Sequence, residues 1–246
     1  MLIPTGAMQF DHFAMITQNI GLIFDLLQTL VLLCCVFYGL FIFYRVSDKR
    51  KYSYLISAMA CVILGDMVSY LTLLFQAPHA YDLTAADLAY CGLYIFLTTT
   101  SLHIRKEWST RRKLDNKKNY AWGHLAAVVT ALLSILPLYV LWRKGASLMT
   151  ELLFTALRIW LAWVSVYMLA SAGERSRKYH LLVFFVFFAD FCASIFSALG
   201  IFPLFLLFDF ALTILFIFLI PTARGIKRRK HSRHEKENTE EKEETV

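Results

Sequence analysis

Five ionisable side chains lie inside long apolar stretches of this 246-residue sequence, where charge is rare. They are Asp25, Asp66, Arg158, Asp190 and Asp209. A charge within a bilayer costs at least ~2.5 kcal/mol, so such residues usually pair, line an aqueous cavity or perform a function. One arginine cannot neutralise four acids, so we expect some of the carboxylates to be protonated, to be solvated in a hydrated pocket, or to pair with a cation. Such a pocket could bind a cationic or zwitterionic ligand, or set two carboxylates to work as acid and base.

The elements that carry these residues are predicted to be membrane-spanning helices. Hydrophobic residues make up 58% of the chain and its mean hydropathy is +0.55, which is typical of an integral membrane protein. We predict an all-α, polytopic bundle of seven transmembrane helices. Their ranges are 18–44, 52–76, 84–104, 120–142, 150–171, 179–200 and 202–222. The apolar run 181–221 would be about 60 Å long as one helix, so we expect it to turn back near residues 200–203.

The parts of the chain outside the predicted spans are short. Residues 1–17 would form an extracytoplasmic N-terminus, 18–222 the transmembrane domain, and 223–246 a charged cytoplasmic tail. The tail is too polar to bury a core, so we expect it to be disordered. No soluble catalytic domain fits in what remains.

The distribution of basic residues predicts the orientation. Twenty-two of the 25 Lys and Arg residues fall in the loops after the first, third and fifth spans and in the tail. The opposite loops hold only Arg143 and Lys144. Because cytoplasmic loops are enriched in Lys and Arg, the N-terminus should lie outside and the C-terminus in the cytoplasm.

With this orientation, the five intramembrane charges all lie about 10–15 Å below the outer face by helical rise. Other polar residues recur three or four positions away on the same helix faces and would join the charges in one layer. We therefore predict an outward-facing acidic pocket inside the bundle. Its predicted ligand-binding residues are Asp25, Asp66, Tyr70, Tyr90, Tyr94, Arg158, Asp190, Ser194 and Asp209.

Some of these acids also have a structural interpretation. Arg158 lies at the depth of Asp190 and could neutralise one carboxylate only to fix helix packing. Asp87 follows Thr84 by three residues, the spacing of a helix capping box, so we expect it to cap its helix. Glu151 is just inside a helix start, where the helix dipole favours an anion.

The order of the spans suggests an internal repeat. Leu64-Gly65-Asp66 is followed by Asp87, and Phe188-Ala189-Asp190 is followed by Asp209 at a similar distance. The first three spans and the last three would then form two units of the same orientation, with the fourth as a linker: a 3+1+3 parallel repeat.

Several classes of function are excluded or lack their signature. The last predicted span has no lysine for a retinal Schiff base, so retinal is excluded, and we expect no cofactor. The basic residues follow topology, and we find no nucleic-acid module. The five cysteines lie in apolar segments without a C-x-x-C pair, so we predict packing rather than a metal site.

Three short motifs resemble those of the lysoplasmalogenase-like (YhhN) membrane hydrolases. They are Leu64-Gly65-Asp66, the run from Gly92 to Phe96, and Ala189-Asp190. The resemblance implies that Asp66 and Asp190 are paired catalytic carboxylates that activate water against a vinyl-ether lipid. The chain departs from that family at Thr100, where a histidine is expected, and at Ala189, where a serine is expected.

A second set of motifs resembles the seven-span sensory input modules of bacterial signalling proteins. The spacing Asp66 to Tyr70 on one span precedes the run from Ala86 to Tyr90 on the next. No kinase or cyclase follows, so this resemblance implies a separate signalling partner at the cytoplasmic face.

We therefore expect a protein of the plasma membrane that binds a small cationic, zwitterionic or amphipathic ligand, as a sensor or carrier. The alternative is a membrane-embedded lipid hydrolase in which Asp66 and Asp190 act as acid and base. Membrane lipid and a small-molecule ligand are the predicted partners of both.

Overall fold

The computed structural model describes residues 5–46, 49–75, 84–109, 117–144 and 148–226. Every regular element in these ranges is a helix. The helices are α1 (Thr5–Arg45), α2 (Arg50–Leu74), α3 (Ala85–Ser109), α4 (Lys117–Arg143), α5 (Met149–Ser171), α6 (Glu174–Leu199) and α7 (Phe202–Arg224). Each overlaps one predicted span, so the all-α prediction is confirmed. The charged tail from residue 227 lies outside the described residues.

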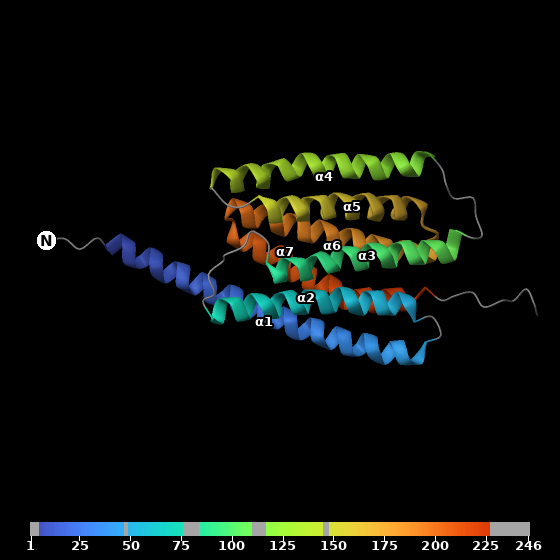
Figure 1. The fold of residues 1–246 in the computed structure, drawn as a ribbon, viewed down its shortest axis with the longest axis horizontal. Helices are drawn as coiled ribbons and strands as arrows, with labels where there is room; N and C mark the ends of the chain where they lie inside the picture. The colour runs from blue at the N-terminus through green and yellow to red at the C-terminus, as the bar shows by residue number, and fades with distance from the viewer. Residues whose placement is uncertain (1–4, 47–48, 76–83, 110–116, 145–147, 227–246) are drawn as a thin grey trace, which may run out of the picture.

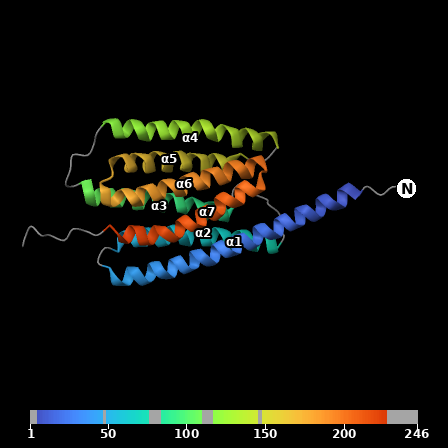
Figure 2. The ribbon, with the colours of Figure 1, turned by 180° about the vertical axis from the view of Figure 1, so that it is seen from behind.

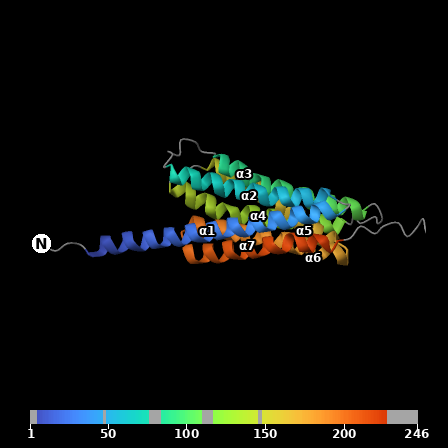
Figure 3. The same cartoon turned by 90° about the horizontal axis from the view of Figure 1, so that it is seen from below.

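The helices run up and down along one direction and form an elongated bundle (Figure 1). α4 lies at one edge of the bundle, where it packs on α5 and α6. α1 packs on α2 and α7, as seen from behind in Figure 2. The first turns of α1 extend beyond the ends of the other helices (Figure 3). This extension begins at Thr5, so the first helix starts well before the predicted residue 18.

The predicted reversal of the chain between the last two helices is confirmed. α6 ends at Leu199 and is capped by Gly200, whose φ of 74° lies in the left-handed region that favours glycine. The amide of Gly200 donates to the Ser197 carbonyl, which satisfies one of the last free acceptors of α6. Pro203 follows in the first turn of α7, where its missing N–H costs nothing.

Six of the seven described helices are long and apolar enough to cross a membrane. The exception is α3, which carries Asp87 and four consecutive hydroxyl residues at 98–101. α3 packs against α2, α5 and α6, so much of its polar surface faces other helices. The large apolar side chains on the outside of the bundle, such as Leu132 and Phe218, are more than half exposed, as expected for a surface in contact with lipid.

Two lysines join helix ends across the bundle. Lys51 is only 3% exposed and its Nζ donates to the main-chain carbonyl of Ile226, 2.7 Å away, just after α7. Lys144 Nζ donates to the Ala198 carbonyl in the last turn of α6, at 2.8 Å. In each case a cation satisfies a carbonyl at the negative end of a helix dipole.

Candidate functional site

Two separate polar clusters surround the two aspartates that the sequence singled out. The first, which we call the Asp66 cluster, joins α1, α2 and α3. Asp66 accepts hydrogen bonds from the Thr29 hydroxyl at 2.9 Å and from the Tyr90 hydroxyl at 2.6 Å, one on each of its carboxylate oxygens. Both donors are neutral, and among the described residues Asp66 has no cationic partner.

A glycine allows this cluster to form. A Cβ atom at Gly65 would come within 2.6 Å of the Tyr90 ring, closer than any normal contact. The same pair of helices is brought together at Gly92, where a Cβ would meet the Cys61 sulfur at 2.4 Å. α2 and α3 therefore approach closely enough for Tyr90 to reach the carboxylate on the neighbouring helix.

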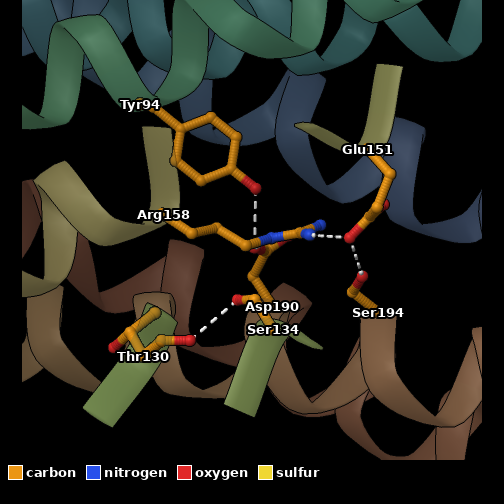
Figure 4. A network of polar contacts seen from close by, with 7 residues as sticks. All are labelled: Tyr94, Thr130, Ser134, Glu151, Arg158, Asp190 and Ser194. Atoms are coloured by element: carbon orange, nitrogen blue, oxygen red, sulfur yellow. Dashed lines mark hydrogen bonds and ion pairs between the residues drawn. The ribbon is translucent and has the colours of Figure 1, made fainter. Parts of the chain in front are cut away.

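The second cluster, the Asp190 network, joins α3, α5 and α6 (Figure 4). Asp190 Oδ2 accepts from the Tyr94 hydroxyl at 2.6 Å and from Arg158 Nε at 3.1 Å. Arg158 Nη1 donates to Glu151 Oε1 at 2.9 Å, and the Ser194 hydroxyl donates to the same oxygen at 3.4 Å. By formal charge, one guanidinium faces two carboxylates, so the network has an excess of negative charge.

The surroundings of the network are partly polar. Thr155 lies between Glu151 and Arg158 on α5; its hydroxyl is buried and has no partner among the described residues. On α4, Ser134 donates to the Thr130 carbonyl at 2.8 Å beside the network (Figure 4). The unpartnered Thr155 hydroxyl leaves a donor and an acceptor available to a bound molecule.

Six of the nine predicted pocket residues belong to these two clusters. They are Asp66 and Tyr90 in the first, and Tyr94, Arg158, Asp190 and Ser194 in the second. Tyr70 lies one turn beyond Asp66 on α2 but does not hydrogen-bond to it. Asp209 is half-buried on α7, where Thr213 donates to its main-chain carbonyl at 3.1 Å. The side chain of Asp25 lies outside the described part of the chain.

Two members of the clusters were not among the predicted pocket residues. Thr29 was missed, although it follows Asp25 by four positions and therefore shares its helix face. Glu151 was interpreted as an acid at a helix start, which is correct in position but incomplete, because it also pairs with Arg158. The signal for that pair was the seven-residue spacing, which places both on one face of α5.

The capping role predicted for Asp87 is confirmed. Its Oδ2 accepts from the Thr84 amide at 2.8 Å and from the Thr84 hydroxyl at 2.6 Å. The Asp87 amide donates back to the Thr84 hydroxyl at 3.2 Å. This is the reciprocal arrangement of a capping box, and it occupies Asp87 at the start of α3.

The fold and the buried polar clusters define the class of protein: a helical bundle with the composition of a multi-pass integral membrane protein. Comparison with known protein families, with curated proteins and with solved structures finds no match for the chain.

Proposed function

We propose that the protein recognises a small ligand that carries a cationic group, and that Asp66 is the main point of attachment. The observation that carries this proposal is the contrast between the two aspartates. Asp190 is paired with the guanidinium of Arg158, whereas Asp66 is held only by the hydroxyls of Thr29 and Tyr90. A half-buried carboxylate with neutral donors gains most from a positively charged partner.

The Asp190 network supports the same proposal as a second point of contact. Its two carboxylates exceed its one cation, so it also attracts positive charge rather than repelling it. The buried Thr155 hydroxyl offers a neutral hydrogen-bonding group beside it. Arg158 also lets the network accept an anionic group, which extends the ligand class to zwitterions.

The proposed arrangement in the membrane has α3 as a seventh span, the N-terminus outside and the C-terminus in the cytoplasm. In this orientation, which the basic loops support, both clusters lie in the outer half and the ligand enters from outside. The cytoplasmic ends then remain available to a separate signalling partner. We propose the plasma membrane as the location.

The helix contacts support the proposed 3+1+3 repeat. α1 packs on α2 and α7, and in the same way α5 packs on α6 and α3. α2 contacts both α3 and α7, just as α6 contacts both α7 and α3. If α1, α2 and α3 are exchanged with α5, α6 and α7, the list of helix pairs in contact stays the same, apart from the pairs that include α4. Two matched units with a ligand between them are common in membrane carriers, so the pattern favours a carrier over a sensor.

The alternative function is hydrolysis of a lipid by Asp66 and Asp190. It requires both carboxylates to act on one water, with one protonated and the other not. Each aspartate is instead held by its own donors, which favours recognition over hydrolysis. Release of aldehyde from a lysoplasmalogen by the purified protein, and its loss in Asp66→Asn, would support the hydrolase instead.

The proposal is tested by ligand-induced thermal stabilisation of the purified protein in lipid nanodiscs. The probes are choline, ethanolamine and spermidine. Choline is compared with 3,3-dimethyl-1-butanol, which has the same shape without the charge. Because a ligand that binds the folded state raises the melting temperature by mass action, we expect stabilisation by a cationic probe and none by the neutral analogue.

Two variants make the result specific to the site. Asp66→Asn should abolish the stabilisation while the protein still folds, because asparagine keeps the shape and one acceptor oxygen but loses the charge. Asp87→Asn removes a carboxylate from the helix cap and should leave the stabilisation unchanged. Equal stabilisation of wild type by choline and its neutral analogue, or full stabilisation of Asp66→Asn, would contradict the proposal.

A further inference from the structure

Buried polar atoms without partners gather along α3 beyond the Asp190 network. Thr98 and Ser101 follow Tyr94 by four and seven residues, which places all three on one face of the helix. Thr98 is 5% exposed and Ser101 is fully buried. Within the described residues, neither hydroxyl has a hydrogen-bond partner. The polar face of α3 therefore continues from Tyr94 toward the end of the helix that we assign to the cytoplasm.

α6 presents matching groups to this face. Tyr179 precedes Asp190 by eleven residues, close to three full turns, so both lie on the same face of α6. The Tyr179 side chain is fully buried, and its hydroxyl lies beside those of Ser101 and Thr100 without completing a hydrogen bond. The ring of the buried His180 meets the Tyr179 ring edge-on, and its Nδ1 also lacks a partner in the described chain.

α3 and α6 contact each other only slightly, and α5 packs against both of them. The neighbouring face of α5 offers small side chains, Ala162 and Ser165, both fully buried. A buried polar atom without a partner is strongly unfavourable, and native proteins almost always satisfy such groups. Bound water is the usual partner where several polar atoms converge.

We infer that the seam between α3 and α6, from Tyr94 to Tyr179, is an internal water-binding site. Water molecules there accept from and donate to Thr98, Ser101 and Tyr179, and they extend the hydrogen bonds of the Asp190 network toward the cytoplasmic end. The seam thus supplies a polar path through the cytoplasmic half of the bundle. Among the described residues, the buried ion pairs of Arg158 lie in the other half. This inference does not depend on which ligand binds Asp66.

The experiment is hydroxyl-radical footprinting by X-ray radiolysis of the full chain in nanodiscs, with modified residues quantified by mass spectrometry. Radicals formed from bound water modify the side chains beside it, even when those side chains are closed to bulk solvent. Tyr179 is compared with Tyr52, which has the same ring chemistry and is only 1% exposed. We expect Tyr179 to be modified several-fold faster than Tyr52.

A double variant, Thr98→Val with Ser101→Ala, removes two of the hydroxyls with little change of shape. We expect it to lower the modification rate of Tyr179 to that of Tyr52. Its melting temperature gives a second readout, since replacing a dry, unpaired hydroxyl by an apolar group stabilises a protein, whereas removing a partner of bound water does not.

Two outcomes would overturn the inference. One is equal modification of Tyr179 and Tyr52 in the wild-type protein, which does not depend on any variant. The other is a double variant with a higher melting temperature than wild type, which would mean that the seam is dry.

Discussion

Tyr90 and Tyr94 lie one helical turn apart on α3, and each donates a hydrogen bond of 2.6 Å to a different aspartate. Tyr90 reaches Asp66 on α2, and Tyr94 reaches Asp190 on α6. α3 therefore connects the two clusters through one rigid element. A ligand that shifts α3 by binding at one aspartate would alter the hydrogen bond to the other, which offers a physical route for communication between them.

Removing either tyrosine hydroxyl should destabilise the fold. Tyr90→Phe and Tyr94→Phe each leave a carboxylate with one donor fewer, and a hydrogen bond to a charged group contributes about 1.5–3 kcal/mol. We expect Tyr94→Phe to cost more, because Asp190 is tied to the buried Arg158. Unfolding by SDS in mixed micelles measures the free energy of unfolding of both variants. Tyr38→Phe is the control, because the Tyr38 side chain is exposed. No loss of stability in either variant would contradict the hydrogen-bond assignment.

Replacing Arg158 should be the most damaging single change. Arg158→Met leaves Asp190 and Glu151 without their cation, and an uncompensated buried charge costs about 3–5 kcal/mol. Asp190→Asn in the same chain removes one of the two carboxylate charges left unpaired and should restore part of the lost stability. The double-mutant cycle gives the coupling between the two residues. Additive effects would show that the pair does not interact.

The close packing of α2 on α3 predicts a strong effect of a single methyl group. Gly65→Ala forces the Tyr90 ring away from its position and should cost about 1–3 kcal/mol, by overpacking. It should also weaken any binding that depends on Asp66. Gly173→Ala is the matched control, because nothing lies within 4 Å of a Cβ at that position. Equal melting temperatures for the two variants would rule out the close approach of Gly65 to the Tyr90 ring.

The buried lysine at the start of α2 should support the end of α7. Lys51→Met removes the bond to the Ile226 carbonyl and the favourable interaction with the helix dipole, together about 1–2 kcal/mol. Hydrogen–deuterium exchange should then be faster in the last turn of α7 and unchanged in α4. The exposed neighbour Arg50→Met serves as the control. Unchanged exchange at the end of α7 would contradict this role.

The proposed orientation predicts which helix ends a membrane-impermeant maleimide can reach in intact cells. In a cysteine-free background, Arg143→Cys should be labelled from outside, and Lys178→Cys only after lysis. If α3 does not cross the membrane, every later helix is inverted and the two results exchange. The labelling pattern therefore tests the orientation and the seventh span together.

The sequence was sufficient to predict the helices because the signals for them are local. Long apolar runs between charged loops predicted seven helices, and Gly200 with Pro203 predicted the turn between the last two. The capping box of Thr84 and Asp87 was also predictable, since it spans only three residues.

The partners of each polar residue depended on the tertiary structure. The predicted depths of Asp66 and Asp190 suggested one shared layer, but depth along a helix does not say which neighbour a side chain faces. Helix packing decided that Tyr90 turns to one aspartate and Tyr94 to the other, and it brought Thr29 of α1 to Asp66. The sequence by itself determined a membrane bundle with buried acids. The packing of α5 against α6 gave Asp190 the cation of Arg158, whereas α1 and α3 brought only hydroxyls to Asp66, because side-chain pairing across helices is set by contacts distant in the chain.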